Sequence, residues 1–426
     1  MEVKVFGLGY VGTVTALCLS ELGFDVVGIE PIERKVKELQ EGRLHLYETG
    51  VEELFASDEV KKRFKVEESL EQLGEGKQVV LICVGTPMEA SGAVNLNQVQ
   101  EVFKEVSSLI QGKEKGETLI LLRSTVPPKT CRNLYDKYLK SLTNIDFAFF
   151  PEFLREGQAI KDFKAPRLVC FGHHNEEGRD VQEKWAEFFS KLPGIEKSKW
   201  GSFESTEMIK YAQNSYNALR VAFANEIGSV ASSFGVALDE LTELMIEHNR
   251  NEPAGMYLKP GFCFGGPCLT KELEGITWLG RKSTHELPLL NEILISNEKH
   301  FERYLNTIEN LEAQRILFCG VTFKEHTDDL RNSLVLKLVE RLRTGPQYLK
   351  KKTITIVDRP MVLDSLRNSN WDKHHKVNLV RLDELTLEDY DLVIKGPFLL
   401  EESILRASGV KTLSLGFDQE DSQLPF

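Results

Sequence analysis

The glycine-rich stretch FGLGYVG, residues 6–12, constrains the fold more than any other part of the sequence. An apolar pattern over residues 3–6 predicts a short strand before it, and an apolar-periodic helix follows it. A second strand is predicted over residues 25–29. A glycine-rich turn between a strand and a helix, followed by a second strand, is the opening unit of a doubly wound α/β domain.

Each glycine of this motif has its own physical role. Gly7 allows the tight turn, Gly9 lets the backbone approach a pyrophosphate, and Gly12 lets the helix pack on the strand. The helix N-terminus adds unpaired N–H groups and the positive end of a dipole, both of which favour an anion. In this βαβ setting the motif predicts a dinucleotide site.

The second predicted strand ends at Glu30, about 20 residues after the motif. An acidic side chain here accepts hydrogen bonds from the ribose hydroxyls of NAD and disfavours the 2′-phosphate of NADP. Arg34 and Lys35 lie nearby in the sequence and weaken this preference a little. NAD is therefore the predicted dinucleotide.

Strands and helices continue to alternate through the first part of the chain. Further strands are predicted over residues 78–87, 118–128, 147–154 and 166–172. Ligands of such sheets bind at the carboxyl ends of the strands. Thr86, Thr125 and Glu152 lie at the ends of three of these strands, so we expect them to face one crevice.

The composition fits a globular protein of two or three domains. Its 426 residues are 41% hydrophobic and 28% charged, which supports full-sized cores and argues against disorder. A net charge of −12 disfavours nucleic acid and anionic membranes as partners. There is no signal-peptide pattern and no apolar run near ~18 residues, so we expect a cytoplasmic protein.

Seven cysteines are scattered along the sequence, at positions 18, 83, 131, 170, 263, 268 and 319. They form no CxxC or clustered Cys/His pattern, so no metal site is predicted. Four lie inside apolar runs and are expected to be small core residues. Cys268, in PGFCFGGPCLTKEL, could be a packing residue, half of a disulfide with Cys263, a metal ligand or a nucleophile. A reducing cytosol argues against the disulfide.

The middle of the chain is predicted to be helical, with one long helix over residues 204–235. Lys210, Asn214 and Asn217 follow i, i+4, i+7 spacing on it and share a face. Such a polar stripe is usually the solvated side of a helix. Small apolar residues flank this one, which suggests that it faces a pocket or another subunit. A long helix between two α/β units often forms a dimer interface.

A second, smaller α/β unit is predicted after the helical region. Its strands are expected over residues 314–324, 352–360, 390–397 and 411–417. The first of them ends at Lys324, a cation at the carboxyl edge of a sheet that suits a phosphate-bearing ligand. The predicted fold is α/β, with two Rossmann-like doubly wound units joined by a long central helical dimerisation region. The expected domains are residues 1–202, 203–305 and 306–426.

Seven motifs, in one order, resemble the UDP-glucose/GDP-mannose dehydrogenase family over nearly the whole chain. They are FGLGYVG (6–12), GTP (85–87), STVPP (124–128), PEFLREG (151–157), EMIKYAQNSYNALRVAFANE (207–226), GFCFGGPCLTKE (261–272) and GVTFKEHTDDLRNS (320–333). Within the family, the GDP-mannose dehydrogenase branch is the most similar in sequence to three stretches, EMIKY, YLKPGFCFGG and TDDLRNS.

The resemblance implies an NAD-dependent, four-electron oxidation of a nucleotide sugar. In this family the C6 alcohol becomes an aldehyde and then a carboxylate, through a thiohemiacetal and a thioester. Only a thiolate is both nucleophilic enough and a good enough leaving group near neutral pH. Cys268 matches the family's catalytic cysteine. A nucleotide uronate for a surface polysaccharide would be a fitting product.

The resemblance assigns other roles by position. The catalytic set it implies is Cys268, Lys210, Asn214, Glu272, Thr125 and Glu152. Lys210 would stabilise alkoxide charge or move a proton, and Asn214 would hold an oxyanion or a water. The implied NAD contacts are Gly7, Gly9, Tyr10, Val11, Gly12, Glu30, Lys35, Thr86, Thr125, Glu156, Lys271 and Arg331. The last would reach the NAD of a neighbouring subunit, in a homodimer or larger homo-oligomer.

The implied contacts to the nucleotide sugar come from the same motifs. They are Glu152, Lys210, Asn214, Asn217, Asn225, Tyr257, Leu258, Lys259, Gly265 and Lys324. Gly265 and Gly266 would let the backbone approach the sugar closely. No metal is implied.

The cysteine motif departs from the family's usual GGSCLPKD, since this chain has GGPCLTKE. Glu272 keeps the charge of the usual aspartate but is one methylene longer, and such a displacement can cost about a hundredfold in rate. Pro267 removes a backbone N–H beside the nucleophile, worth on the order of 3 kcal/mol if it served an oxyanion. Thr270 replaces the usual proline, and Phe150 replaces the usual asparagine before PEF.

Two classes of function follow from these residues. The first is an active NAD-dependent nucleotide-sugar 6-dehydrogenase, acting on GDP-mannose or else on UDP-glucose or a UDP-N-acetylhexosamine. The second is a degenerate paralogue that binds NAD or a nucleotide sugar with little turnover. Cys268, Lys210 and Asn214 favour the first, and only the changes flanking Cys268 favour the second.

Overall fold

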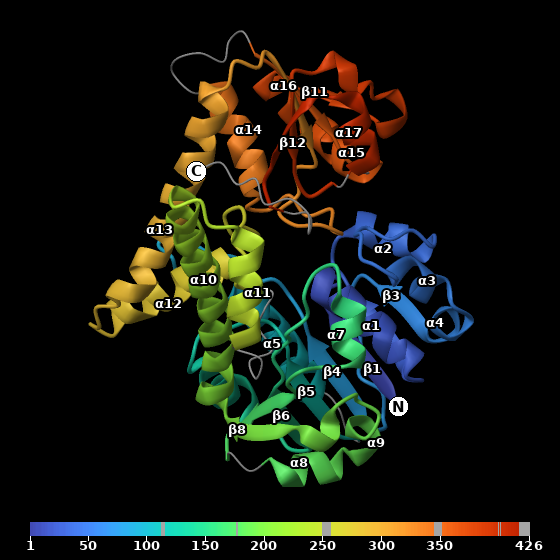
Figure 1. The fold of residues 1–426 in the computed structure, drawn as a ribbon. Coiled ribbons are helices and arrows are strands. Elements are labelled where there is room, and N and C mark those ends of the chain that lie inside the picture. The colour runs from blue at the N-terminus through green and yellow to red at the C-terminus, as the bar shows by residue number, and fades with distance from the viewer. Residues whose placement is uncertain are drawn as a thin grey trace. The chain divides into compact units, whose positions relative to one another are not determined.

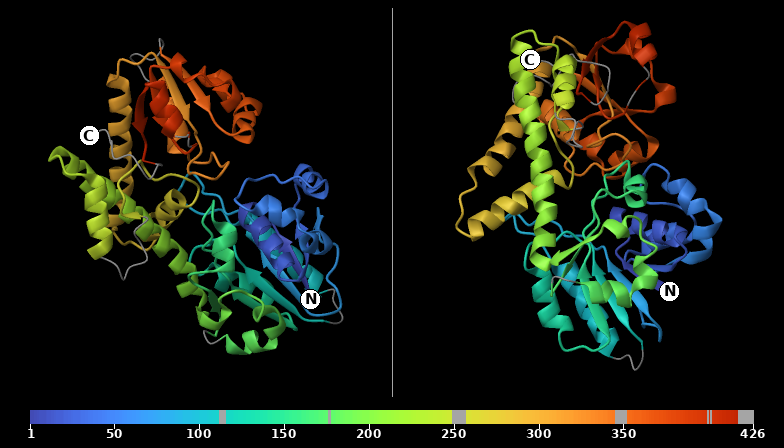
Figure 2. Two further views of the ribbon diagram at one scale, coloured as in Figure 1. Left: turned by 45° about the vertical axis from the view of Figure 1, so that its right-hand side comes forward. Right: turned by 60° about the horizontal axis from the view of Figure 1, so that its bottom comes forward.

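The computed structural model describes residues 1–111, 116–175, 178–248, 257–344, 352–398, 400 and 402–416. The chain divides into two compact units, Met1–Ala212 and Gln213–Phe426. The division falls inside one long helix, α10 (Phe203–Ser233), which is a single continuous element in every view (Figure 1, Figure 2). Each unit has its own sheet.

The first unit is built on an eight-stranded sheet in the order β3-β2-β1-β4-β5-β6-β7-β8. Its strands are β1 (Glu2–Phe6), β2 (Asp25–Ile29), β3 (Phe64–Glu67), β4 (Gln78–Ile82), β5 (Thr118–Leu122), β6 (Ile145–Phe149), β7 (Cys170–His173) and β8 (Lys199–Ser202). They pair in parallel, except that β7 runs antiparallel to β6. The strand order reverses between β1 and β4, which is where a doubly wound sheet binds its ligand.

Helices cover both faces of this sheet, so its central strands are buried along their whole length. The helices are α1 (Tyr10–Glu21), α2 (Glu33–Gln40), α3 (Val51–Ala56), α4 (Asp58–Arg63), α5 (Asn97–Gln111), α6 (Thr130–Leu134), α7 (Ala159–Lys164), α8 (Arg179–Lys184) and α9 (Ala186–Phe189). Alternate residues of β5 enter different cores. Leu119 and Leu121 share a core with residues of α1, whereas Ile120 and Leu122 share one with residues of α5.

The second unit begins with helices and ends in a smaller sheet. After α10 come α11 (Leu238–His248), α12 (Leu269–Lys282) and α13 (Pro288–Asn310). Figure 1 and Figure 2 show α12 and α13 as a helical hairpin. The sheet has the order β11-β10-β9-β12-β13 and is entirely parallel. Its strands are β9 (Arg315–Cys319), β10 (Thr353–Val357), β11 (Asn378–Val380), β12 (Leu392–Lys395) and β13 (Lys411–Ser414), with helices α14 (Leu334–Thr344), α15 (Pro360–Asn368), α16 (Trp371–His375) and α17 (Glu402–Ser408).

The turn after β9, the first strand of the second sheet, has the same hydrogen bonds as the turn after β1 in the first sheet. In the first sheet the N–H of Gly7 donates to the carbonyl of the last residue of β2, at 2.8 Å, and Leu8 N–H donates to the Glu30 carboxylate. In the second sheet Gly320 N–H donates to the last residue of β10, also at 2.8 Å, and Val321 N–H donates to the carboxylate of Asp358. The predicted α/β fold with two Rossmann-like units is therefore confirmed.

Nearly all the predicted strands are found. The helix predicted over residues 204–235 is α10, and the strand predicted over 411–417 is β13, with residue 417 outside the described part of the chain. β3, β8 and β11 were missed because they are short and partly exposed, so they lack a buried apolar run. The division into three domains remains a prediction.

Candidate active site

The glycine-rich turn has the geometry that a dinucleotide requires. Gly7 has a φ of +84°, a conformation that L side chains rarely adopt. A Cβ on Gly12 would lie 1.9 Å from the Gly7 carbonyl oxygen, so only glycine lets α1 approach β1 this closely. Gly9 is exposed, and a Cβ there would meet no atom within 4 Å. The open backbone at the start of α1 fits a pyrophosphate.

Glu30 is held in place at the end of β2, where it is 4% exposed. Its Oε2 accepts hydrogen bonds from Leu8 N–H at 3.1 Å and from the Lys35 ammonium at 3.4 Å. Its Oε1 accepts one from Ile32 N–H at 3.3 Å and keeps a lone pair for a ribose hydroxyl. Lys35, which was expected near the cofactor, is thus the ion-pair partner of Glu30.

Glu48 joins two segments of the expected NAD site, and no sequence pattern indicates it. Its buried carboxylate accepts hydrogen bonds from the N–H groups of Gly157 at 2.6 Å and Ala159 at 3.0 Å, and from the Tyr10 hydroxyl. Burial, and then the bond to Glu48, raise the pKa of Tyr10, so its hydroxyl remains a donor. The start of α1 and the PEFLREG segment are therefore held together by one side chain.

Lys210 and Glu152 form a buried ion pair in the first unit. The ammonium donates to the Glu152 carboxylate at 2.8 Å and to the Glu152 carbonyl at 2.9 Å, and the two side chains are 6% and 9% exposed. Burial opposes ionisation of Glu152, but Lys210, with help from Arg123 and the Leu154 N–H, outweighs it and lowers the pKa of Glu152. Glu152 is therefore a carboxylate at neutral pH.

Arg123, at the end of β5, is a second buried cation that the sequence did not point out. It is 4% exposed, and its guanidinium lies 4.4 Å from the centre of the Phe150 ring. Its Nε and Nη1 have no hydrogen-bond partner among the described residues. Burial lowers the pKa of Arg123, against the opposing effect of neighbours that include Glu152. Phe150 thus places an aromatic face, in place of the family's usual amide, beside this guanidinium.

Glu207 connects α10 to the loop that follows β5. Its carboxylate is fully buried and accepts hydrogen bonds from Lys129 N–H at 2.7 Å and Cys131 N–H at 2.6 Å. Lys129 has a φ of +75° and provides no side-chain cap for α6, so Glu207 supplies the cap from another helix. Since Glu207 lies one turn before Lys210, this contact fixes that lysine relative to the loop of Thr125.

The ionisation of Glu207 is expected to make stability depend on pH. Burial, partly offset by the N–H groups of Cys131 and Lys129, raises the pKa of Glu207 to about 7 from an ordinary 4.5. A carboxyl whose folded-state pKa is raised stabilises the fold fully below pH about 4.5 and loses that contribution as the pH rises through about 7. Relative to Glu207→Gln, the wild type should therefore lose on the order of 2 kcal/mol of unfolding free energy between pH 5.5 and 8.

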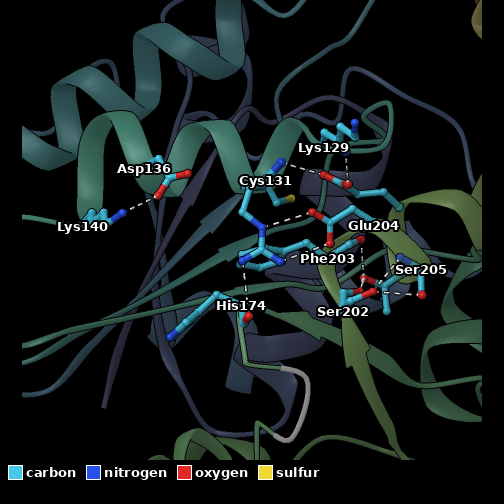
Figure 3. Close-up of polar contacts among 12 residues, drawn as sticks. Lys129, Cys131, Asp136, Lys140, His174, Ser202, Phe203, Glu204 and Ser205 are labelled. Atoms are coloured by element: carbon cyan, nitrogen blue, oxygen red, sulfur yellow. Dashed lines mark hydrogen bonds and ion pairs between the residues drawn. The ribbon is translucent and has the colours of Figure 1, made fainter. Parts of the chain in front are cut away.

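Urea unfolding at the two pH values measures this difference. Glu204→Gln is the matched control, since Glu204 lies on the same helix and accepts hydrogen bonds from Arg132 at 3.1 and 3.3 Å (Figure 3). The Arg132 hydrogen bond lowers the pKa of Glu204, so Glu204 stays ionised in the folded and unfolded states at both pH values, and its substitution should leave the difference in unfolding free energy between pH 5.5 and 8 unchanged. If the unfolding free energies of the wild type and Glu207→Gln change equally between the two pH values, the raised pKa of Glu207 is contradicted.

Cys268 occupies the N-cap position of α12 and is exposed. The N-terminal end of a 14-residue helix is the positive end of its dipole, which stabilises a nearby negative charge such as a thiolate. Other thiols are different, because burial raises the pKa of Cys170 to about 11 and that of Cys83 to about 12. All seven cysteines belong to the described part of the chain, and none forms a disulfide.

Asn214 and Glu272 are hydrogen bonded to each other within the second unit. The Asn214 amide donates to the Glu272 carboxylate, and Glu272 is 2% exposed. The Glu272 N–H donates to the Cys268 carbonyl at 3.0 Å in the first turn of α12. Asn214 follows Lys210 by one turn of α10, as the i, i+4 spacing predicts. Along this helix each of the two polar residues therefore has its own carboxylate partner.

The two glycines before Cys268 lie against other parts of the same unit. A Cβ on Gly265 would lie 2.6 Å from the Asn332 carbonyl oxygen, and one on Gly266 would lie 2.5 Å from the Phe323 ring. Gly266 has a φ of +83° and donates its N–H to the same Asn332 carbonyl at 3.0 Å. These contacts explain why neither position can carry a side chain, because other parts of the chain fill that space. A backbone contact from Gly265 to the sugar remains a prediction.

Asn225 holds the backbone near Cys268. It is 2% exposed, its Oδ1 accepts a hydrogen bond from Gly261 N–H at 2.9 Å, and its Nδ2 donates to the Phe262 carbonyl at 3.3 Å. Both the oxygen and the nitrogen of this amide are therefore already hydrogen bonded to the backbone, and its contact to the nucleotide sugar remains a prediction. Asn217, also on α10, is partly exposed and accepts a hydrogen bond from Gln213 at 3.1 Å.

The remaining expected contacts all lie in described residues, and their roles remain predictions. Thr86 is buried, whereas Val11, Thr125, Glu156, Tyr257, Leu258, Lys271 and Lys324 are half-buried. Lys259 lies 3.5 Å from the Asp239 carboxylate. The Arg331 side chain is 67% exposed and ion-paired with Asp329.

Neither a membrane-spanning helix nor a metal-binding cluster is present in the described ranges. No helix there is both long and apolar enough to cross a bilayer. No three His, Cys, Asp or Glu side chains there are grouped so that they could hold a metal ion.

The first unit has a dinucleotide-type turn on a doubly wound sheet, and the second unit has an exposed cysteine at a helix N-terminus, features that fit an oxidoreductase. Residues 1–191 match the NAD binding domain of the UDP-glucose/GDP-mannose dehydrogenase family, and residues 204–299 match its central domain. The GDP-mannose 6-dehydrogenase of Pseudomonas savastanoi pv. phaseolicola is 31% identical over 400 residues, covering 92% of this chain and 89% of that protein. The chain therefore belongs to the UDP-glucose/GDP-mannose dehydrogenase family, and its cofactor is NAD.

Other relatives agree on the family and differ in substrate. The UDP-glucose 6-dehydrogenase of Bacillus subtilis (strain 168) is 29% identical over 350 residues, covering 80% of this chain and 77% of that protein. The structure of a UDP-glucose dehydrogenase from the hyperthermophilic archaeon Pyrobaculum islandicum has a TM-score of 0.80 at 25% identity, covering 98% of this chain and 95% of that chain. These matches define a nucleotide-sugar dehydrogenase without fixing the sugar.

Proposed function

We propose that this chain oxidises the C6 alcohol of a nucleotide sugar to a carboxylate, using two molecules of NAD for each sugar. The observation that carries the proposal is Cys268, an exposed thiol at the N-terminus of α12, with Glu272 one turn further along the same helix. A dehydrogenase that stops at the aldehyde needs no nucleophile. One that continues to the acid can use a thiol to capture the aldehyde, so that the second hydride is lost from a thiohemiacetal.

Lys210 and Glu152 suit the first oxidation. Loss of hydride from C6 requires that the hydroxyl give up its proton and that the developing alkoxide be stabilised. A buried ammonium supplies that stabilisation, since charge interactions are strong where water is excluded. The proton can pass to Glu152 or to a water beside it. NAD, when bound in the first unit, supplies the hydride acceptor.

Cys268, Asn214 and Glu272 suit the second oxidation and the hydrolysis. The Cys268 sulfur adds to the aldehyde carbon, and the carbonyl oxygen takes up a proton to give a thiohemiacetal. Loss of that proton and of a second hydride leaves a thioester. Water then attacks the carbonyl carbon, the C–S bond breaks, and the thiolate leaves. Glu272 can accept the proton of the water, and Asn214 keeps one amide hydrogen for the oxyanion.

GDP-mannose is the proposed substrate, and UDP-glucose and UDP-N-acetylhexosamines are the alternatives. Support comes from the 31% identity to a GDP-mannose 6-dehydrogenase and from the sequences of three motifs, EMIKY, YLKPGFCFGG and TDDLRNS, which resemble that branch of the family. The product would be the corresponding nucleotide uronate.

The deciding experiment is NADH formation from the purified protein and NAD, with limiting GDP-mannose, UDP-glucose, UDP-N-acetylmannosamine or UDP-N-acetylglucosamine, run to completion. Two NADH per sugar with one of them would establish the reaction and the substrate. Absence of NADH with all four, although calorimetry shows NAD binding, would contradict the proposal.

A degenerate binding protein is the second candidate, and Pro267 is the observation that favours it. A proline has no N–H, so the residue before Cys268 offers no backbone donor to an oxyanion. In the same experiment a partly degenerate site would give one NADH per sugar, or a lasting adduct on Cys268 that mass spectrometry detects.

We also propose that the chain forms a homodimer through α10. Tyr216, Phe223 and Val230 recur at seven-residue spacing on this helix, and each is about half exposed. Such a repeat of exposed large apolar side chains is the pattern of a helix that packs against another helix. Leu244, on α11, is 61% exposed and extends the apolar surface of the second unit. Arg331 would then be available to the NAD of the partner subunit, as the resemblance implies.

Replacing Phe223 with glutamate is expected to convert the dimer to a monomer, because a carboxylate would have to be buried between two helices without a counter-charge. Sedimentation equilibrium measures the change. Gln111→Glu, which adds the same charge to an exposed position of α5, should leave the assembly intact. A wild type that sediments as a monomer would refute the proposal.

A further inference from the structure

The segment that leads to Cys268, residues 260–268, is called the cysteine loop here, and side chains of two helices hold it in place. Residues 260–267 contain no helix or strand, so their backbone groups need partners from elsewhere. Phe264 finds both of its partners in one side chain of α13. Its N–H donates to Asn297 Oδ1 at 3.0 Å, and its carbonyl accepts from Asn297 Nδ2 at 2.9 Å. A single amide thus pairs with Phe264 as a neighbouring strand would.

The upstream end of the cysteine loop is held in the same manner. Besides its bond to Asn225, Gly261 uses its carbonyl to accept a hydrogen bond from His300 Nε2 at 2.8 Å, and His300 lies one turn after Asn297 on α13. The Arg303 guanidinium donates to His300 Nδ1 at 3.2 Å, which leaves the ring proton on Nε2. Burial lowers the pKa of His300 to about 4, so the ring is neutral at physiological pH.

From these contacts we propose that Asn297 is a positioning residue for the Cys268 nucleophile, and this rests on the proposed function. Only three residues separate Phe264 from Cys268. Gly266 is bonded to the Asn332 carbonyl, and Pro267 has a fixed φ. Phe264 and Gly266 are therefore two anchor points of the segment that positions the sulfur, and releasing Phe264 leaves the segment held at the second alone. Displacing a reacting atom by about an ångström can cost on the order of a hundredfold in rate.

Asn297 is a better test of this idea than Asn225 or His300. Those two are almost fully buried, so their removal would leave a cavity and unsatisfied buried groups. Asn297 is only half-buried, and its truncation mainly releases the two backbone groups of Phe264. Asn291, an exposed residue of the same helix, offers a matched control.

The experiment compares Asn297→Ala, Asn297→Asp and Asn291→Ala with the wild type. For each we would measure kcat and KM, the rate of Cys268 alkylation by iodoacetamide, and hydrogen exchange in peptides containing Phe264. Asn297→Ala is expected to lower kcat by about 10- to 100-fold and to speed exchange at Phe264 at least tenfold. The alkylation rate should change at least threefold. Asn297→Asp keeps the acceptor for Phe264 N–H but faces the carbonyl with a second oxygen, so it should also lower kcat while remaining folded.

Three results would overturn the proposal. The first is unchanged exchange at Phe264 in Asn297→Ala. The second is faster exchange with kcat within threefold of the wild type. The third is an effect on kcat no larger than that of Asn291→Ala. If no nucleotide sugar is oxidised, the proposed function fails, but alkylation and exchange still decide whether Asn297 holds the cysteine loop. If Asn297→Ala does not fold, Asn297→Asp supplies the same three measurements.

Discussion

Replacing Cys268 with serine is expected to lower the rate of uronate formation by on the order of 10⁴-fold or more. A serine hydroxyl is almost wholly un-ionised near neutral pH, whereas a cysteine thiol ionises far more readily than a hydroxyl and its thiolate is strongly nucleophilic. The thiolate is also a far better leaving group when water attacks the acyl intermediate. Oxidation of the alcohol does not need the sulfur, so the variant should yield at most one NADH per sugar.

The measurement is total NADH from a limiting amount of nucleotide sugar, together with chromatography of the products. Cys170→Ser is the matched control. It makes the same atomic change at a thiol on β7, whose pKa burial raises to about 11 and which is therefore protonated and unreactive. That variant should still give two NADH per sugar. If Cys268→Ser also gives two, the covalent mechanism is excluded.

The sequence was sufficient to predict the fold class of this molecule and the local geometry of its glycine-rich turn. The glycine motif and its acid at the end of β2 are local features, since every residue of the turn lies within one βαβ unit. The structure agrees in detail, because Gly7, Gly12 and Glu30 each make the close contact that the motif requires. The spacing of Lys210 and Asn214 likewise predicted one helix and one face.

What the sequence could not give is the pairing of these residues with distant ones. Glu48 and Gly157 are 109 positions apart, and Glu207 and Lys129 are 78 apart. No period or motif links such positions, so nothing in the local pattern predicts that a carboxylate will accept a particular backbone N–H. Gly265 is a further example. The sequence indicated that the backbone is closely approached at this glycine, but it did not indicate the neighbour that leaves no room for a side chain, Asn332, which lies in a distant loop.

Lys210→Met is expected to have the second-largest effect, and it should reduce both stability and activity. The substitution leaves the Glu152 carboxylate in the interior without its ammonium, and breaking a buried pair in this way costs about 3–5 kcal/mol. Activity should fall by about 10²- to 10⁴-fold, because the first oxidation loses its stabilising cation. Urea unfolding and NADH formation measure the two effects separately.

Glu152→Gln separates charge burial from catalysis. Added to Lys210→Met, it removes the uncompensated charge, so the double variant should recover most of the lost stability. Its activity should stay low, since neither the cation nor the carboxylate has been restored. A double variant that regained turnover would show that Lys210 acts only by keeping the fold intact.

The pH dependence of this pair follows from the lowered pKa of Glu152 in the wild type. A carboxyl whose folded-state pKa is lowered stabilises the fold above its ordinary pKa, and that contribution is lost as the pH falls through the folded-state value. Without Lys210, burial prevails and the pKa of Glu152 should rise, so the sign of the pH dependence of stability reverses.

Lys210→Met should then be least stable relative to the wild type at pH 8 and should regain stability towards pH 5, as Glu152 takes up a proton. The double variant, in which no carboxyl titrates at this position, should show no such recovery. A stability difference between Lys210→Met and the wild type that is constant from pH 5 to pH 8 would mean that Glu152 is not buried with its charge.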